Sequence, residues 1–500
     1  MKSTTGQSIL KMGYIMQTLN RKNFNKNKYP TKIMQFGEGN FLRAFVDWQI
    51  DKLNQTSDLS AGIAIIRPID YDTLPLLNTQ DGLYTTIIRG LNEQGETVSE
   101  ERIIGCVNEE IPIYKNLERF LELATNSDLK IIFSNTTEAG IEYIDSDKLE
   151  DKPAKAFPAK LTQWLFHRFN HFTGSAESGM VIIPCELIDY NGEKLKEIVL
   201  KYAKNWQLPE EFTQWLNVHN HFCSSLVDRI VTGFPRDEHQ QLQESLGYLD
   251  NFMVTAEYFH LFVIQGPKHL AELLCLKDSD VNIKIVDDIS PYKQRKVAIL
   301  NGAHTALVPL AYMANIDSVG DALSAQLFER YLTQLIADEI IPTLDLPADE
   351  LKKFASDVLN RFRNPYICHL LLSISLNSMT KFKTRLLPQL FKYVELNQKV
   401  PELIAMAMAG QILFYRGVRN DESIALSDSE QWLAFFKDNW LEYGLGSLSI
   451  DQLVEKFLAC DWHWETNLND ISGLKQSIVG YLQSMLNTSV AATIESKLGQ

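Results

Sequence analysis

Short apolar runs alternate with longer amphipathic stretches through the first half of the chain. The runs are rich in Ile and Val and cover residues 32–36, 62–67, 83–89, 130–134 and 180–184, and helical patterns cover residues 40–53, 117–125 and 158–172. Alternation of this kind predicts βαβ units and a mainly parallel sheet with helices on both faces. The segments "TTIIRG" and "GETVSEERIIG" predict an antiparallel hairpin inserted in that scheme.

From about Ser290 onward the pattern changes to helical periodicity with few strand signals, as in "AQLFERYLTQLIADEIIPTL" and "LIAMAMAGQILFYRG". A chain of 500 residues is too long for a single hydrophobic core. We therefore predict an α/β, Rossmann-type domain over residues 1–288, with residues 1–16 as a loosely ordered extension, and a mostly α-helical domain over residues 289–500. A ligand-binding cleft is expected between the two domains.

Charge and cysteine content narrow the range of functions. The formal net charge is −15, which argues against non-specific binding to nucleic acid or to an anionic membrane. An anionic substrate would therefore need a local cationic pocket. The six cysteines form no CxxC pair, which favours a reducing, cytoplasmic compartment without a thiolate metal site. No apolar run reaches the roughly 20 residues of a spanning helix, and the N-terminus lacks a signal-peptide pattern, so we expect a soluble protein.

Two glycines follow the first predicted strand in "QFGEGNFLRAF" and lead directly into a helix. In a dinucleotide-binding turn, Gly37 would permit the tight turn, and Gly39 would let the backbone approach the pyrophosphate at the helix N-terminus. Leu42 stands where the full fingerprint has a third glycine, so a plain strand–helix corner remains an alternative. On the dinucleotide interpretation, the cofactor contacts come from Phe36, Gly37, Gly39, Asn40 and Phe41.

Two later strand ends offer further cofactor contacts. Asp70 follows the second strand and can accept a hydrogen bond from a ribose 2′-hydroxyl, which favours NAD over NADP, although Arg67 nearby weakens this preference. Asn135 and Thr136 follow the fourth strand, at the edge where an open parallel sheet binds its ligand. Loops of Ser, Asn and Thr are also typical of any strand end.

The segment "SPYKQRKVAILNGAHTALVP" places three polar residues in an otherwise apolar helix that Ser290 and Pro291 begin. On an α-helix, His304 lies about 80° and Asn301 about 140° around from Lys296, so all three can reach one pocket. Their chemistry suits interconversion of a ketone and an alcohol without a metal. A lysine can serve as acid or base when burial lowers its pKa, and amide and imidazole groups can polarise the oxygen. The alternative is a surface lysine, a helix irregularity and a satisfied interior histidine.

These motifs, together with "FSNTTEAGI", "PAKLT", "IPCELIDYNG" and "FCSSLVDRIVTG", resemble the polyol-specific long-chain dehydrogenases, also called the mannitol dehydrogenase family. The likeness runs from about Thr18 to the C-terminus. Lys-x4-Asn-x2-His is the catalytic signature of that family. "QFGEGNFLRAFVDWQ" and "CELIDYNG" favour its uronate branch over the mannitol enzymes.

The resemblance implies an NAD-dependent, metal-independent oxidoreductase that interconverts a keto-uronate and an aldonate. Lys296 would be the general acid/base, Asn301 with Asn191 would hold the reacting oxygen, and His304 would bind a substrate hydroxyl. Related enzymes often carry Asn at the position of Leu187, so this branch could polarise the carbonyl differently. We expect no nucleic-acid or membrane partner, and a monomer or small homo-oligomer.

A carboxylate-bearing substrate calls for a guanidinium or ammonium group in the site. The helical domain offers the basic cluster Arg361, Arg363, Lys381, Lys383 and Arg385. Most of these are expected to be solvated, and Arg361, Arg363 and Lys381 are the candidate carboxylate ligands. One sequence leaves open which keto-uronate epimer fits, whether a neutral polyol such as mannitol is the substrate, and whether the chain is a non-enzymatic NAD sensor.

Overall fold

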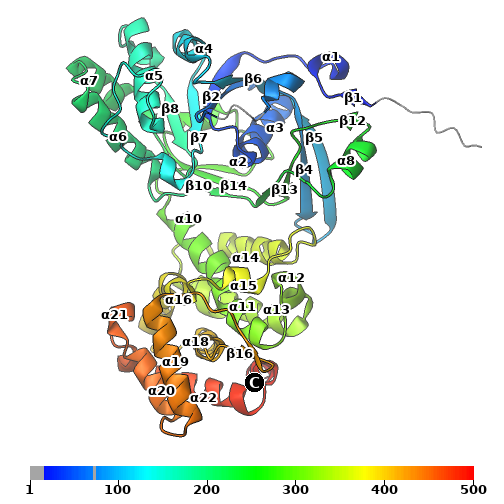
Figure 1. Ribbon diagram of the computed structural model, residues 1–500, viewed down its shortest axis with the longest axis vertical. Coiled ribbons are helices and arrows are strands. Elements are labelled where there is room, and N and C mark those ends of the chain that lie inside the picture. Colours follow the sequence, from blue (N-terminus) through cyan, green and yellow to red (C-terminus); the bar gives the residue numbers. More distant parts are fainter. Residues whose placement is uncertain (1–15, 71–74, 500) are drawn as a thin grey trace, which may run out of the picture. The chain divides into compact units, whose positions relative to one another are not determined.

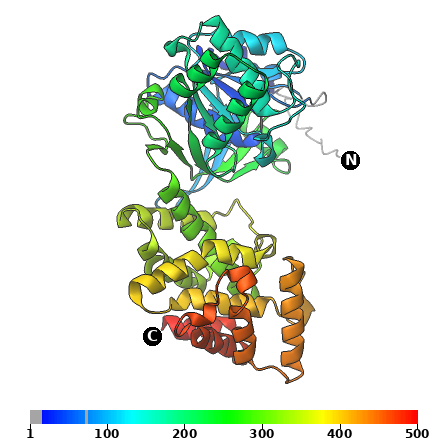
Figure 2. The same ribbon diagram turned by 90° about the vertical axis from the view of Figure 1, so that its left-hand side faces the viewer.

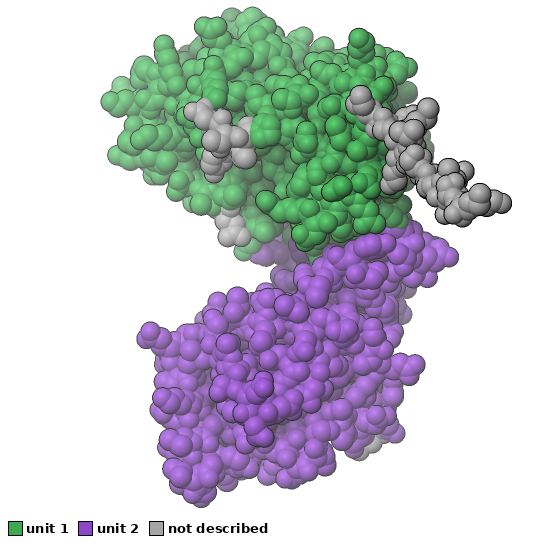
Figure 3. All heavy atoms as spheres, turned by 45° about the vertical axis from the view of Figure 1, so that its right-hand side comes forward, with its two compact units in different colours: residues 1–89, 99–287 green, residues 90–98, 288–500 purple. Residues whose placement is uncertain are grey.

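A computed structural model describes residues 16–70 and 75–499. Except for Met16, the predicted N-terminal extension lies outside the described residues. The chain divides into two compact units (Figure 3). The first unit consists of Met1–Arg89 and Ser99–Asp287, and the second consists of Gly90–Val98 and Asp288–Gln500.

A six-stranded sheet forms the centre of the first unit (Figure 1). Its order is β6-β3-β2-β7-β8-β9, and every neighbouring pair is parallel. The strands are β2 (Thr31–Phe36), β3 (Gly62–Arg67), β6 (Val107–Pro112), β7 (Ile131–Ser134), β8 (Val181–Pro184) and β9 (His221–Phe222). With the first strand of the sheet in the middle, this is the Rossmann order, and it confirms the predicted α/β fold class.

Both faces of this sheet are buried, which explains its continuous apolar strands. Ile33 and Phe133 belong to the core on one face, together with Phe45 of the helix that follows the glycine turn. Met34 and Ile132 belong to the core on the opposite face. That second core also contains buried residues from α5 (Phe157–His171), α6 (Asn191–Asn205) and α7 (Glu210–His219). Each fully buried aliphatic or aromatic side chain stabilises the fold by about 1.5–3 kcal/mol.

The remaining strands of the first unit lie outside this sheet. The predicted hairpin exists, but β4 (Tyr84–Leu91) and β5 (Thr97–Ile104) belong to a separate four-stranded sheet of order β11-β13-β4-β5, so its expected place in the parallel scheme is wrong. A three-stranded sheet has the order β10-β14-β15. The sequence patterns did not predict β10 (Ser224–Asp228), β11 (Val231–Gly233), β13 (Val254–Glu257), β14 (Leu261–Gln265) or β15 (Ile283–Val286).

The second unit is helical (Figure 2), as predicted. Its longer helices are α11 (Gly302–Met313), α13 (Gln326–Gln334), α14 (Ala348–Phe362), α16 (Ser378–Arg385), α17 (Leu387–Asn397), α18 (Glu402–Phe414), α19 (Glu430–Gly444), α20 (Ile450–Leu458), α22 (Leu474–Asn487) and α23 (Val490–Leu498). Helix α18 is buried from Leu403 to its last residue and packs against α11 and α22, which explains its almost unbroken apolar sequence.

The helix that carries the candidate catalytic residues begins with α10 (Ser290–Arg295). Ser290 was expected to cap this helix but lies inside it. The carboxylate of Asp288 accepts a hydrogen bond from the Ser290 N–H at 2.8 Å instead. An acidic group at this end of a helix also interacts favourably with the helix dipole.

The tip of the β4–β5 hairpin groups with the second unit. Lys353 of α14 forms an ion pair with Glu93 at 2.8 Å, and Asn360 of the same helix donates to the Asn92 carbonyl at 3.4 Å. The division predicted at residues 288–289 did not assign this short segment to the helical part of the chain. Its pairing with α14 depends on tertiary contacts that no local pattern reveals.

All six cysteines are free thiols. Within the described part of the chain, every helix is too short or too polar to span a membrane.

Candidate active site

The glycine turn joins β2 to a continuous helical stretch that runs from Asn40 to Thr56. Gly37 has φ = +110°, a conformation that residues with a Cβ rarely adopt, and a Cβ built at this position would lie 2.8 Å from the Asn135 carbonyl oxygen. Its N–H donates to the Ile66 carbonyl at 3.0 Å. Glycine at position 37 is therefore required by the fold, because β2, β3 and the loop after β7 meet there.

Gly39 is different, because a Cβ built on it meets no atom within 4 Å. Gly39 is the N-cap of the helix that follows, and no side chain of the described residues caps this terminus. Unpaired N–H groups at a helix start attract anionic groups such as a pyrophosphate. The open space and the uncapped terminus fit a dinucleotide better than they fit a plain strand–helix corner.

Glu38, the acidic residue between the two glycines, lies close to the guanidinium group of Arg67. Glu38 Oε1 lies 3.8 Å from Arg67 Nε, and Arg67 also pairs with the buried Glu110 at 2.6 Å. Arg67 is itself buried, whereas Asp70 is exposed beyond the end of β3. Arg67 is thus held by two carboxylates, and Asp70 remains the accessible charge at this strand end.

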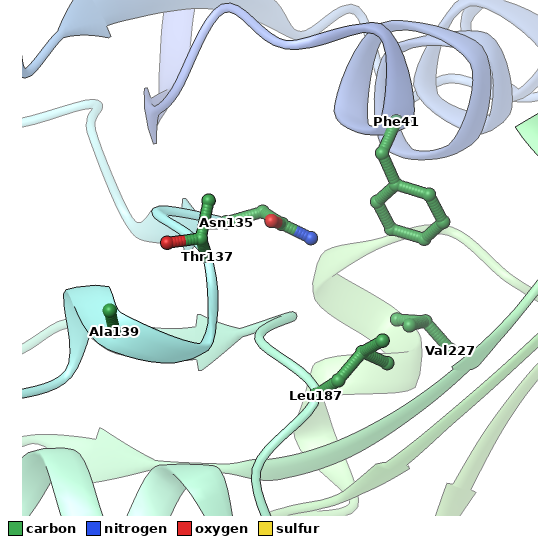
Figure 4. A pocket seen from close by; sticks show the side chains of 6 residues that line it. All are labelled: Phe41, Asn135, Thr137, Ala139, Leu187 and Val227. Carbon is green, nitrogen blue, oxygen red and sulfur yellow. The ribbon is translucent and has the colours of Figure 1, made fainter. Parts of the chain in front are cut away.

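A pocket of about 570 Å³ lies beside the glycine turn (Figure 4). Its lining is Phe41, Asn135, Thr137, Ala139, Leu187 and Val227. Figure 4 shows the Asn135 amide extending toward the space between the Phe41 ring and Leu187. Phe41 and Asn135 were predicted cofactor contacts, whereas Thr137, Ala139 and Val227 were missed, because small and apolar side chains carry no distinctive signal in the sequence.

The loop after β7 is tied to the loop after β8 through a buried carboxylate. Glu186 accepts hydrogen bonds from the Thr136 N–H at 2.9 Å and from the Ser134 hydroxyl at 3.0 Å. Burial raises the pKa of Glu186, and the Thr136 N–H opposes that rise. Thr137 has φ = +74°, a strained conformation for a β-branched residue, and such strain is common at functional sites. Thr136 therefore shapes the pocket through Glu186 and does not line it.

The structure does not support the assignment of Asn191 as a donor to the substrate. Asn191 is buried, and its amide nitrogen donates to the carbonyls of Pro184 and Glu186, both at 3.0 Å. Its amide oxygen accepts from the Ser225 N–H at 2.8 Å. These contacts occupy both N–H groups and the oxygen. Asn191 thus holds the loop that carries Leu187 and does not present a free amide.

A buried carboxylic acid lies behind the glycine turn. Asp47 Oδ2 accepts a hydrogen bond from the Tyr84 hydroxyl at 2.7 Å. Asp47 Oδ1 and Gln35 Oε1 are both buried without a partner in the described structure, and the Gln35 amide nitrogen donates to the Gly37 carbonyl at 3.0 Å. Burial raises the pKa of Asp47 from 3.8 to about 7, although the Tyr84 hydrogen bond opposes the rise. A proton on Asp47 would therefore stabilise the region that supports the turn.

We expect the Asp47→Asn variant to remove a pH dependence of stability. The folded state binds the Asp47 proton more tightly than the unfolded chain does, so this stabilisation is complete below about pH 4 and is lost as the pH rises through 7. Relative to the neutral isostere, the wild type should lose up to about 4 kcal/mol of unfolding free energy between pH 4 and pH 8. Urea unfolding of both proteins over this range measures the difference, and parallel curves would contradict the assignment.

In the second unit, Lys296 and Asn301 are the two ends of a π-helical segment, η6 (Lys296–Asn301), between α10 and α11. The i→i+5 hydrogen bonds of a π-helix place residues five apart about one turn from each other. The two side chains are therefore closer in direction than the 140° expected for an α-helix. Both residues are half-buried. Single π-helical turns inside α-helices are frequent at functional sites.

His304 lies on the next turn, in α11, and its ring stacks on Phe362 at a centroid distance of 4.1 Å. Its Nε2 atom is buried without a partner in the described structure. Burial, helped by the charges of the neighbouring basic residues, lowers the pKa of His304 to about 3. His304 is thus a neutral hydrogen-bonding group at ordinary pH. His304 is therefore poorly suited to donate a proton near neutral pH.

Basic residues surround His304. Arg361, Lys381 and Arg385 all lower its pKa after burial, together with His369. Arg363, in contrast, forms a short ion pair with Glu329. Of the three predicted carboxylate ligands, Arg361 and Lys381 thus lie near the catalytic signature, whereas Arg363 is neutralised. Arg385 was in the same basic cluster but was not one of the three.

The described residues contain no group of three or more His, Cys, Asp or Glu side chains arranged to hold a metal ion.

Comparisons with known proteins find one family model for each of two consecutive segments of the chain. The family model for the mannitol dehydrogenase Rossmann domain matches residues 31–278, and the model for the mannitol dehydrogenase C-terminal domain matches residues 288–486. The altronate oxidoreductase of Enterobacter sp. (strain 638) is 55% identical over 480 residues, which is 96% of this chain and 99% of that protein. The altronate oxidoreductase of Yersinia enterocolitica is 54% identical over 479 residues, with the same coverage.

Two solved structures share the fold. A substrate-free D-sorbitol dehydrogenase has a TM-score of 0.77 at 18% identity, covering 96% of this chain and 100% of that chain. The mannitol 2-dehydrogenase of Pseudomonas fluorescens, a ternary complex with NAD and D-mannitol, has a TM-score of 0.63 at 19% identity, covering 97% of this chain and 100% of that chain. This chain belongs to the mannitol dehydrogenase family.

Proposed function

We propose that this chain is an NAD-dependent oxidoreductase that interconverts D-tagaturonate and D-altronate in hexuronate catabolism. The observation that carries the proposal is the half-buried pair Lys296 and Asn301 at the two ends of η6, one turn before a neutral His304. Relatives of 54–55% identity along almost the whole chain are altronate oxidoreductases, which supports this substrate pair. The six free thiols favour a reducing, cytoplasmic compartment.

The glycine turn and the pocket beside it would hold the dinucleotide. The uncapped helix start at Gly39 suits the pyrophosphate, and Asp70 suits a ribose hydroxyl. Arg67, the cation that could have favoured a 2′-phosphate, is held by Glu110 and Glu38. This arrangement supports NAD over NADP. When bound, the cofactor supplies or accepts the hydride.

The residues of η6 and α11 would control the proton and the reacting oxygen. Lys296 donates a proton to the oxygen that becomes the alcohol, and removes it in the reverse direction. The Asn301 amide makes no side-chain hydrogen bond within the described structure, so it remains available to hold the same oxygen. His304 carries no charge at neutral pH and can bind a neighbouring hydroxyl. Lys296 is therefore the acid/base in this scheme.

The test is NADH consumption by the purified protein with D-tagaturonate, D-fructuronate and D-fructose, each with and without a chelator. We expect turnover of D-tagaturonate with a kcat/KM at least about tenfold above that for the epimer, because one misplaced hydroxyl leaves buried polar groups unpaired. Preference for D-fructuronate or D-fructose would reassign the substrate. A loss of activity with the chelator would overturn the metal-independent scheme. No turnover of any of the three would contradict the proposal.

A further inference from the structure

Helix α16 places two cations one turn apart. Lys381 and Arg385 are four residues apart and therefore lie on the same side of the helix. Like charges at this spacing destabilise a helix by roughly 0.2–0.5 kcal/mol. Both side chains are only half exposed, and burial lowers the pKa of each of them. A bound anion would stabilise two partly desolvated cations at one site.

Neither cation forms an ion pair within the described structure, although the nearby Asp428 carboxylate opposes the lowering of the Lys381 pKa by burial. Arg385 Nη1 donates to the Thr305 hydroxyl at 3.3 Å, and Lys381 Nζ donates to the Ile374 carbonyl at 2.7 Å. Lys383, which lies between them in the sequence, is instead paired with Glu465 at 2.7 Å. The basic residue on the other side of the helix is therefore paired with a carboxylate, whereas Lys381 and Arg385 form no ion pair within the described part of the chain.

The pair lies against the catalytic helix. Thr305, which accepts from Arg385, follows His304 directly and donates to the Asn301 carbonyl at 2.9 Å. A Cβ on Gly302 would lie 3.7 Å from the Arg385 carbonyl oxygen, so α16 ends next to the start of α11. Arg385 thus reaches the segment that carries Asn301 and His304. One of its five N–H groups is used by Thr305, and the others are sufficient for a two-pronged contact.

We propose that Arg385, oriented by the Thr305 hydroxyl, binds the carboxylate of the substrate, and that Lys381 adds a second positive charge beside it. This inference rests on the proposed function and assigns the group that distinguishes an acid sugar from a neutral polyol. Thr305 is a positioning residue. The planar guanidinium matches the two carboxylate oxygens, which the single ammonium of Lys381 cannot do.

The test compares Arg385→Gln with Lys383→Gln, which removes an equal charge from the same helix at a position paired with Glu465. For Arg385→Gln, we expect the KM for the keto-uronate to rise about 100-fold, because a charged hydrogen-bonded contact is lost. The change in kcat should be small, and NADH affinity, measured by fluorescence titration, should be unchanged. Lys383→Gln should behave as wild type. Thr305→Val should raise KM by about fivefold with kcat retained.

Binding of D-altronate in the presence of NADH, measured by calorimetry, separates this inference from the proposed function. No hydride transfer can occur in that mixture, so the measurement does not depend on turnover. If the wild type binds D-altronate and the Arg385→Gln variant does not, the carboxylate contact is supported, even if the wild type shows no turnover in the activity assay. Equal binding by both proteins would overturn it, as would an equal rise in KM for D-fructose. Tighter binding of inorganic phosphate than of D-altronate would also overturn it, because the site would then suit a phosphate ester.

Discussion

Lys296→Ala should lower kcat by about 10²–10⁴-fold, the usual contribution of a positioned general acid/base. The expected loss is in kcat, because the lysine acts on the proton that moves in the transition state. KM for the substrate and the affinity for NADH should change little. Steady-state kinetics with saturating NADH, together with fluorescence titration of the cofactor, measure these effects. Added primary amines should restore part of the activity at a rate that depends on their pKa.

Two control variants make the Lys296 result specific. Lys296→Arg retains the positive charge but cannot release its proton near neutral pH, so it should be nearly as inactive as alanine. Lys352→Ala removes an exposed charge from α14 and should be as active as the wild type. A Lys296→Ala enzyme within tenfold of wild-type kcat would assign the proton transfer to another group. His304 is a poor replacement, because burial lowers its pKa to about 3.

Alanine at Gly37 and at Gly39 should have different effects on stability and similar effects on cofactor binding. At Gly37 the positive φ and the 2.8 Å approach of the Asn135 carbonyl oxygen require the turn to shift, which costs about 1–3 kcal/mol. A fall of roughly 5 °C in Tm is therefore expected. At Gly39 the added methyl group meets nothing, so Tm should stay within about 1 °C of the wild-type value.

Both glycine variants should bind NADH at least about tenfold more weakly, a loss of about 1.4 kcal/mol. Gly37→Ala displaces the loop that lines the pocket, and Gly39→Ala fills the open space where the cofactor backbone would lie. Thermal unfolding and fluorescence titration together separate the two causes. Wild-type affinity in Gly39→Ala would show that the dinucleotide does not approach this residue. The exposed Gly444→Ala variant, at a position with no positive φ and no atom near the added Cβ, is the matched control for added bulk.

Four strands of the central sheet, β2, β3, β7 and β8, could be predicted because burial on both faces leaves a simple pattern, whereas β6 and β9 were missed. The apolar run of β3 was predicted with both ends correct, and β2, β7 and β8 differ by one residue at their starts. The strands after Phe222 were missed, although the run "LFVIQ" of β14 carried a usable signal. Shorter strands such as Val231–Gly233 have too few residues for periodicity to be visible.

Only part of the candidate site could be predicted from local sequence patterns. Gly37, Gly39 and the Lys-Asn-His spacing depend on backbone geometry and could be identified in the sequence. The π-helical turn could not, because the arc of about 140° between Lys296 and Asn301 was calculated for an α-helix. The basic cluster could not be ranked, because the neutralisation of Arg363 by Glu329 depends on residues that are distant in the sequence. Asn191 shows the same limit, since its partners come from the end of β8 and from β10, which are distant from each other in the sequence.

The assignment of Gly90–Val98 to the second unit affects how the polypeptide can be divided. The backbone passes from one unit to the other three times, after Arg89, after Val98 and after Asp287. A fragment that stops at Asp287 would retain Glu93 without Lys353, and its partner fragment would lack the segment that α14 binds. Limited proteolysis at the hairpin should consequently release neither unit as one continuous fragment.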